Sequence, residues 1–202
     1  MAAVLEAIAE EICACQRCPL GRGRLKAVPG DGPAHPKVML IGEAPGHHEN
    51  QQGRPFVGPA GQFLSELLAA ARLRREDVFI TNIVKCRPPG NRDPQPEEIE
   101  ACGDFLSRQI AAIRPQMIVT LGRYSLGRFF PGQAISRIHG QPSTVGTATV
   151  FPMYHPAAAL HQPTLRKTLL DDMAKLPGIL ALLEPRPAPP PPVEPPRQLN
   201  LF

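Results

Sequence analysis

The sequence lacks the features that direct proteins into membranes or to secretion. No stretch of its 202 residues approaches the ~18 consecutive apolar residues that a membrane span needs. Residues 1–11 carry acidic side chains and have neither the basic start nor the cleavage site of a secretion signal. We therefore expect a cytoplasmic protein with no membrane partner.

A strong charge excess and internal repeats are also missing. The formal net charge is +4 and the isoelectric point is about 9.0. This modest excess suits a polyanionic partner but is common in proteins without one. The length suits one domain with a single buried core, which we assign to residues 1–183 and expect to act as a monomer.

Short apolar runs alternate with amphipathic segments along this domain. Residues 37–42 form an apolar run that ends at glycine, whereas Phe63, Leu64, Leu67 and Leu68 recur at helical spacing. The predicted strands are 37–42, 78–84, 117–121 and 145–151, and the predicted helices are 2–13, 60–73, 96–113, 123–130 and 163–183. This alternation predicts an α/β fold, a three-layer α/β/α sandwich around a central, mainly parallel four-stranded sheet. Ligands of such sheets bind beyond the carboxyl ends of the strands.

Five cysteines without a secretory signal argue against a disulfide framework. Cys15 and Cys18 form a C-x2-C pair, and Cys86 and Cys102 follow with 15 residues between them. Two such pairs are consistent with a four-thiolate site, and their spacing suits both zinc and an iron-sulfur cluster. For Cys13 we expect a buried apolar position.

A loop rich in Gly and Pro follows the first predicted strand. It runs from Gly42 to Gly61 as G-E-A-P-G-H-H-E-N-Q-Q-G-R-P-F-V-G-P-A-G, and it contains neither common phosphate-binding fingerprint. The run resembles the first motif of the family 4 uracil-DNA glycosylases, G-E-A/G-P-G-x-x-E-D-x-x-G-x-P-F-V-G. Asn50 departs from the usual Asp of that family, which leaves open how this position holds the loop.

The resemblance continues in three later motifs and covers roughly residues 15–176. These motifs are T-N-I-V-K-C-R-P-P from Thr81, I-S-R-I-H-G from Ile135 and H-P-A-A-A-L from His155. The family hydrolyses the N-glycosidic bond of uracil in single- or double-stranded DNA, the start of base excision repair. The resemblance implies the same activity here and a [4Fe-4S] cluster bound by Cys15, Cys18, Cys86 and Cys102.

The resemblance also assigns roles in a pocket that receives a flipped-out uracil. Phe56 resembles the residue that stacks on the base, and we expect an exposed ring. Asn82 resembles the amide that reads the uracil edge, since an amide both donates and accepts. His155 resembles the histidine that hydrogen-bonds O2 and stabilises the uracil anion. Gly42 and Ala44 belong to the pocket wall. Without their motifs, the three side chains would suit a core Phe, a turn Asn and a polar loop His.

The identity of the general base is the open point of this interpretation. In the best-known uracil glycosylases an Asp positions the attacking water, and Ala44 occupies its place here. Glu43 is the nearest carboxylate, and we expect it to orient water or to stabilise the oxocarbenium-like sugar. The resemblance gives Glu49 the exclusion of the thymine methyl group, because Gly46 replaces the Tyr used elsewhere. Either glutamate could instead bind backbone amides.

Several residues are expected to meet DNA. Leu160 and His161 follow the last motif, where relatives push a wedge into the duplex, and a buried Leu is the alternative. We also expect five basic side chains at the surface, where they could meet DNA phosphates: Arg54, Lys85, Arg87, Arg92 and Arg123.

The composition changes after Leu183. Residues 184–197 are dominated by proline and predict a disordered, extended linker. The last five residues resemble the bacterial sliding-clamp-binding peptide Q-L-S/D-L-F. We expect Leu201 and Phe202 to enter an apolar pocket of the clamp while Gln198 fixes the orientation.

Two other functions remain open from the sequence. A uracil-DNA binding protein would trap the abasic product covalently, as some relatives do through a histidine in an R-R-I-H loop after the Asn motif. Residues 88–94 contain no histidine, which favours turnover. A redox or interaction module would instead use the cluster as its functional centre. Assays on uracil-containing DNA distinguish all three.

Overall fold

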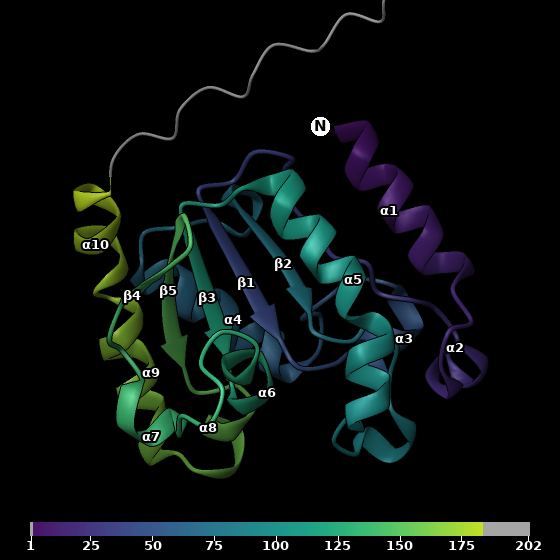
Figure 1. The fold of residues 1–202 in the computed structure, drawn as a ribbon. Coiled ribbons are helices and arrows are strands. Elements are labelled where there is room, and N and C mark those ends of the chain that lie inside the picture. The colour runs from purple at the N-terminus through teal and green to yellow at the C-terminus, as the bar shows by residue number, and fades with distance from the viewer. Residues whose placement is uncertain (1, 184–202) are drawn as a thin grey trace, which may run out of the picture.

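A five-stranded sheet forms the centre of the structure, a computed structural model that describes residues 2–183. Its strands are β1 (Val38–Gly42), β2 (Val78–Asn82), β3 (Met117–Leu121), β4 (Ser143–Val145) and β5 (Ala148–Met153). The spatial order is β2-β1-β3-β5-β4. All pairings are parallel except that of β4 with β5. The predicted mainly parallel α/β sheet is confirmed (Figure 1).

The strand count differs from the prediction at the side of the sheet that ends in β4. The segment 145–151 was expected as one strand, but Gly146 adopts a φ of 61° and the chain reverses there. The segment therefore spans the last residue of β4, a tight turn and most of β5. β4 has three residues, all at least partly exposed, so no apolar run marks it in the sequence.

Helices cover both faces of the sheet. They are α1 (Ala2–Ala14), α2 (Pro19–Gly23), α3 (His47–Gln52), α4 (Pro59–Ala70), α5 (Pro96–Ile113), α6 (Arg123–Gly127), α7 (Ile135–Ile138), α8 (Ala158–His161), α9 (Thr164–Met173) and α10 (Leu176–Leu182), with 3-10 turns η1 (Arg75–Asp77) and η2 (Pro89–Asn91). α5 has the predicted bounds. The predicted helix 163–183 is two helices, because Pro177 begins a new first turn. Four short helices, α2, α3, α7 and α8, were not predicted.

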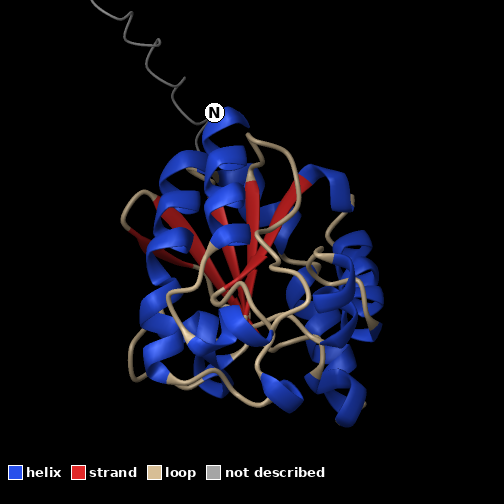
Figure 2. Cartoon of the chain, turned by 90° about the vertical axis from the view of Figure 1, so that its right-hand side faces the viewer, coloured by secondary structure: helices blue, strands red, loops and turns tan. Residues whose placement is uncertain are grey.

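Alternate residues of β1 point into two separate cores. Val38 and Leu40 belong to a core with residues of α4, α9 and α10. Met39 and Ile41 belong to the other core, with residues of α1 and α5. Strands buried on both faces are apolar along their whole length, as β1 is. The three-layer sandwich is confirmed, and Figure 2 shows the sheet enclosed between helices.

Two further expectations concern membrane spans and the residues after Leu183. No helix within residues 2–183 is long and apolar enough to cross a membrane. The predicted linker 184–197 and the clamp-binding peptide 198–202 lie outside the described residues.

Candidate active site and cysteine site

A cavity of about 270 Å³ lies beyond the carboxyl ends of β1, β2 and β5, where ligands of parallel sheets bind. The structure brings together these predicted pocket residues: Glu43, Ala44, Glu49, Phe56, Asn82 and His155. Pro45 and Gly46 also line the cavity, as expected of the wall from Gly42 to Phe56. The sequence interpretation missed these further lining residues: Ala60, Pro88, Asn91 and Ala157. Arg92, expected at phosphates, also lines the cavity. All of the missed residues except Asn91 lie within the motifs that predicted the pocket.

Gly42 lies next to two side chains that line this cavity, those of Asn82 and Phe56. A Cβ atom at Gly42 would lie 2.4 Å from Oδ1 of Asn82 and 2.7 Å from Cζ of Phe56. Gly42 thus belongs to the pocket because only glycine leaves space there. Asn82 is 1% exposed, and within residues 2–183 its buried Oδ1 has no hydrogen-bond partner. An unpaired buried acceptor is costly, so this oxygen is poised for a ligand N–H group.

Phe56 is a wall of the cavity and not the exposed platform that we expected. Its side chain is 6% exposed, and its ring stacks on that of His155 with centroids 5.6 Å apart. The backbone has a φ of 51°, which is uncommon for a residue with a side chain. Arg75 stabilises this conformation by donating hydrogen bonds to the carbonyl oxygens of Phe56, at 3.0 Å, and of Pro55. The strained residue is held by its surroundings, as is common at functional sites.

His155 is held as a neutral imidazole of defined tautomer. The backbone N–H of Ala157 donates a hydrogen bond to Nδ1 of His155 over 3.1 Å. Because Nδ1 accepts, the ring hydrogen of the neutral form is on Nε2. Burial lowers the pKa of His155 to about 4, against the opposing negative charge of Glu49. At neutral pH the ring therefore offers one donor, the Nε2–H group.

Glu49 binds the loop that surrounds it. Its Oε1 accepts from the backbone N–H groups of Val57, at 2.8 Å, and Gly58, at 2.9 Å, and its Oε2 accepts from that of Gly46, at 3.0 Å. Of the two alternatives for this residue, backbone binding is therefore present in the structure. Glu49 also lines the cavity, so the residue that fixes the loop forms part of the cavity wall.

Glu43 lies in the same wall in a different electrostatic setting. Burial raises the pKa of Glu43, the nearby carboxylate of Asp93 adds to this rise, and Arg123 opposes it. A carboxylate with a raised pKa is better matched to accept a proton near neutral pH. Arg123, expected at DNA phosphates, forms an ion pair with Asp93.

Asn50 shows how the unusual position in the first motif holds the loop. The residue is 5% exposed, and its Oδ1 accepts a hydrogen bond of 3.0 Å from the backbone N–H of Leu25. The carbonyl oxygen of Asn50 accepts a second one, of 3.1 Å, from Lys26. An amide oxygen replaces a carboxylate oxygen as acceptor here, so Asn serves at this position.

The residues expected to meet DNA have different environments. Leu160 is 46% exposed on α8, which excludes the buried alternative, and His161 beside it is also exposed. Lys85 is 1% exposed, and the prediction of a surface position for it was wrong. The exposed Arg54 forms an ion pair with Asp31. Arg87 is partly buried, and its guanidinium hydrogen-bonds the side chains of Asn91 and His47.

The four predicted ligand cysteines line one small cavity between α1, α2 and α5. Its lining includes Cys15, Cys18, Cys86 and Cys102, with Arg24 and Lys85. Burial raises the pKa of Cys86, and a hydrogen bond of 3.0 Å from Arg24 opposes this. Burial raises the pKa of Cys102 to about 11, against the lowering effect of the Lys85 charge.

Cys13 does not join this cavity and is exposed, so its predicted burial was wrong. The buried stripe of α1 carries Ile8 and Ile12. Cys13 follows Ile12 directly, and neighbouring helix residues point about 100° apart, which turns its side chain towards solvent.

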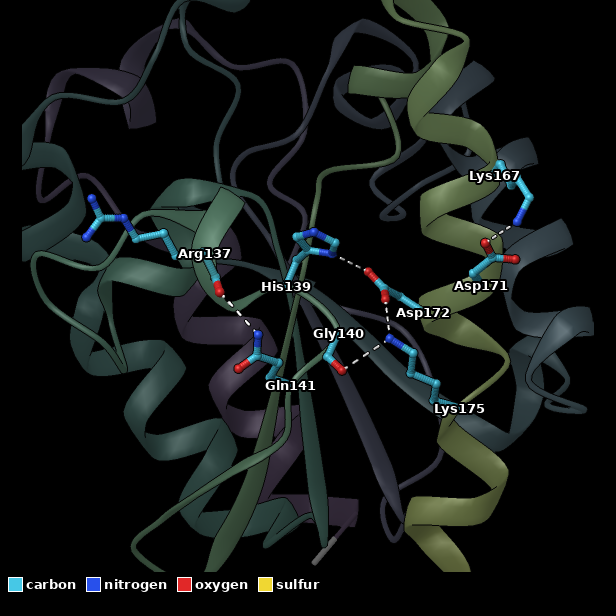
Figure 3. Close-up of polar contacts among 8 residues, drawn as sticks. All are labelled: Arg137, His139, Gly140, Gln141, Lys167, Asp171, Asp172 and Lys175. Carbon is cyan, nitrogen blue, oxygen red and sulfur yellow. Dashed lines mark hydrogen bonds and ion pairs between the residues drawn. The ribbon is translucent and has the colours of Figure 1, made fainter.

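A second polar network lies at the end of β5 and is shown in Figure 3. Asp172 on α9, with a side chain 4% exposed, contacts Nδ1 of His139 at 2.6 Å and Nζ of Lys175 at 2.7 Å. Lys175 also donates to the carbonyl oxygen of Gly140 at 3.4 Å. The His139 ring packs on Tyr154 with centroids 4.8 Å apart. The third motif thus anchors the segment that leads into His155.

Comparisons with known proteins agree with this arrangement. The family model of the uracil DNA glycosylase superfamily matches residues 29–175. A type-4 uracil-DNA glycosylase of Saccharolobus solfataricus is 48% identical over 182 residues, which cover 85% of this chain and 84% of the relative. One of Thermotoga maritima is 43% identical over 177 residues, 85% of this chain and 92% of the relative. A type-5 enzyme of Thermus thermophilus is 34% identical over 60% of this chain and 69% of the relative. The chain therefore belongs to the uracil DNA glycosylase superfamily and, within it, to the type-4 family.

Proposed function

We propose that this protein removes uracil from DNA by hydrolysing the N-glycosidic bond of deoxyuridine, which starts base excision repair. The observation that carries the proposal is the unpartnered, buried Oδ1 of Asn82, which lies beside the ring of Phe56 in a cavity that His155 also lines. These groups offer an acceptor, an aromatic face and a neutral donor. Uracil needs all three.

The chemistry follows from these groups. A uracil flipped out of the duplex packs against Phe56 and donates its N3–H to Asn82 Oδ1. Cytosine has no hydrogen on N3 and would bring a lone pair against this oxygen. As the C1′–N1 bond breaks, its electron pair passes to the base, and the Nε2–H of His155 donates to the developing oxyanion at O2. The neutral form of His155 supplies this donor at neutral pH.

The two glutamates divide the remaining tasks. We assign Glu43 to orienting the water whose oxygen bonds to C1′, or to stabilising the positive charge that develops on the sugar. The proton of that water leaves to Glu43 or to solvent. We assign Glu49, which lines the cavity while it accepts three backbone N–H groups, to excluding the methyl group of thymine. Gly42 and Ala44 leave space for the base.

An assay on synthetic DNA tests the activity. The protein is incubated with single- and double-stranded oligonucleotides that contain one uracil, and alkali-labile breaks and released base are measured. Asn82→Ala and His155→Ala, shown to be folded, are each expected to slow excision by about 10²-fold or more. Near-native rates in both variants would refute the assignment of this cavity as the uracil-binding pocket. A stoichiometric covalent adduct would indicate a trap, and no reaction at all would indicate a module without this enzyme activity.

We also propose that Cys15, Cys18, Cys86 and Cys102 bind a [4Fe-4S] cluster. The donor set fits, because all four line one cavity. Within the described part of the chain, no group of three or more His, Cys, Asp or Glu side chains is arranged to bind a metal ion. The choice of a cluster over zinc follows the resemblance to the family 4 uracil-DNA glycosylases, which implies a [4Fe-4S] cluster at these four cysteines. When bound, the cluster would supply a cross-link between distant segments.

Iron content tests this assignment. Replacing any of the four cysteines by serine should abolish the bound iron and the visible absorption of the cluster. Cys13→Ser is the matched control, because this thiol is exposed and lies outside the cavity. It should retain the iron. Zinc in place of iron in protein purified without oxygen would refute the assignment.

Further proposals concern partners. We assign Leu160 to the wedge that enters the duplex and His161 to a neighbouring DNA contact, both being exposed. We assign Gln198, Leu201 and Phe202 to binding of a bacterial sliding clamp by a monomeric enzyme. A peptide of residues 190–202 should bind the clamp, and absence of measurable binding would remove this proposal.

A further inference from the structure

Lys85 is a buried lysine whose three hydrogen-bond partners are all uncharged. Its side chain is 1% exposed. Nζ donates to Oγ1 of Thr81 at 2.7 Å, to the carbonyl oxygen of Asn82 at 2.8 Å and to Oε1 of Gln109 at 2.8 Å. An ammonium group has three donors, and each has an acceptor here. Burial lowers the pKa of Lys85 to about 7, whereas three acceptors around Nζ match the protonated form, and a charge buried at such a cost calls for a reason.

The backbone of Lys85 belongs to the cysteine site. Its N–H group hydrogen-bonds the thiol of Cys102, and the next residue along the chain is Cys86. Lys85 also lines the cavity that the four cysteines share. The charge of its side chain lowers the pKa of Cys102, and Nζ also contacts Asn82 at the end of β2. One residue therefore contacts both the cysteine site and the residue that faces the base.

The ammonium also lies where three segments of the chain meet. Thr81 and Asn82 end β2, and Gln109 comes from α5. Thr81 Oγ1 and Gln109 Nε2 both donate to the carbonyl oxygen of Pro29, at 2.9 and 2.8 Å. Removing the ammonium would leave the carbonyl of Asn82 and the side chain of Gln109 without this shared donor.

The backbone of Asn82 is what sets the position of its side chain. Because Oδ1 of Asn82 has no partner in the described structure, no hydrogen bond orients that oxygen before the base arrives. Its location depends on the backbone and on contacts with its neighbours. The hydrogen bond from Lys85 to the carbonyl of Asn82 acts on this backbone directly.

We propose that Lys85 is a positioning residue, which holds the carbonyl of Asn82 through its buried ammonium and so fixes where the side chain of Asn82 meets uracil. This inference rests on the proposed function. Lys85 does not line the uracil cavity, so it acts through Asn82. By the same contacts it connects the order of the cysteine site to the pocket without any transfer of electrons.

Lys85→Met tests the proposal, because it keeps a linear side chain and removes the charge and the donors. We expect kcat for uracil release to fall by about 10- to 100-fold, the loss that a misplacement of about 1 Å can produce. KM for the oligonucleotide should change less than about threefold, because phosphate contacts dominate DNA affinity. The iron content should equal that of the wild type.

A double variant separates positioning from packing. Adding Gln109→Met gives the Met side chain at position 85 an apolar neighbour. It also removes Oε1 of Gln109, one of the acceptors that Lys85→Met leaves without a donor. The thermal stability should recover, but kcat should stay low, since the link to Asn82 is still absent. Recovery of kcat together with stability would overturn the proposal, because packing alone would then explain the loss.

Further comparisons keep the test decisive. If Lys85→Met does not fold or does not load iron, the nearly isosteric Thr81→Val takes its place and should lower kcat about three- to tenfold, since it removes one acceptor that locates the ammonium. Wild-type kcat in the folded, iron-loaded variant overturns the proposal. The wild-type enzyme is assayed in parallel, and its failure to release uracil would refute the proposed function and not the role of Lys85.

Discussion

One added methyl group at Gly42 should abolish most of the uracil excision and leave the fold intact. Gly42 ends β1 directly opposite Asn82 of β2. A Cβ atom there would lie 2.4 Å from Oδ1 of Asn82 and 2.7 Å from Cζ of Phe56. The φ of Gly42 is not positive, so the backbone accepts alanine without strain. The whole effect of Gly42→Ala is therefore steric and falls on the two side chains proposed to contact uracil.

The size of the effect follows from these distances. Ordinary contacts of a Cβ begin at 3.4 Å, so the Asn82 oxygen must move by about 1 Å. A misplacement of about 1 Å in a catalytic site costs about 10²-fold in rate, which corresponds to about 2.7 kcal/mol. Overpacking of this kind also costs about 1–3 kcal/mol of stability. We expect a folded protein that excises uracil about a hundred times more slowly.

The assay is single-turnover release of uracil from an oligonucleotide, with urea unfolding measured on the same samples. Gly178→Ala is the matched control, because Gly178 lies on the exposed side of α10 and a Cβ there would meet nothing within 4 Å. This control should excise uracil at the native rate and gain about 0.5–1 kcal/mol of stability. A wild-type rate in folded Gly42→Ala would refute the proposed positions of both pocket side chains.

Four further predictions follow from the same geometry. The pKa of His155 is about 4 in the fold and 6.5 in the unfolded chain, so the unfolded chain binds more protons between these values; the free energy of unfolding should fall as pH drops from 6.5 to 4, and His155→Gln should lose this part of a urea-denaturation pH profile. Because burial raises the pKa of Glu43 above 4.5, the excision rate should rise with pH through that raised pKa, and Glu43→Gln should flatten this limb of the pH–rate curve; an unchanged limb would exclude Glu43 as the titrating group. Asp172→Ala removes the carboxylate that contacts both His139 and Lys175 and should cost about 1–3 kcal/mol in urea unfolding; a smaller loss would show that the network is dispensable. Gly61→Ala would place a Cβ 1.9 Å from the carbonyl oxygen of Phe56 and should slow excision more than it lowers affinity for uracil DNA, measured by gel shift; equal losses would contradict this.

The pattern of apolar residues predicted the longer elements because each of them buries either one face or its whole length. α5 carries its buried residues at helical spacing, and β1, β2 and β3 are buried at every position. β4 and the four-residue helices α7 and α8 are too short to show a period, and their conformations depend on contacts elsewhere. Element type was therefore predictable where the element itself buries a face, and not where neighbours impose it.

The same distinction holds for the site residues: motifs located some of them, whereas the burial of others depends on distant partners. The motifs located Asn82 and His155 correctly in one cavity, because loops after parallel strands meet at one edge. The burial of Lys85 could not be read from the sequence, because one of its three acceptors, Gln109, lies 24 residues away on another element. The burial of Phe56 likewise depends on distant partners, since Arg75 holds its backbone from 19 residues away.

The hydrogen bonds of the two pocket glutamates bear on the proposed roles of these residues, since Ala44 occupies the place of the usual Asp. Glu49 uses both carboxylate oxygens to accept from three backbone N–H groups, so neither oxygen is free of protein donors. Glu43 accepts no hydrogen bond through its carboxylate from any residue within 2–183, and its pKa is raised by burial. A proton acceptor near neutral pH needs a free oxygen and a raised pKa. Glu43 has both, which supports the proposal that it takes the place of the missing Asp, one position before Ala44 on the same loop.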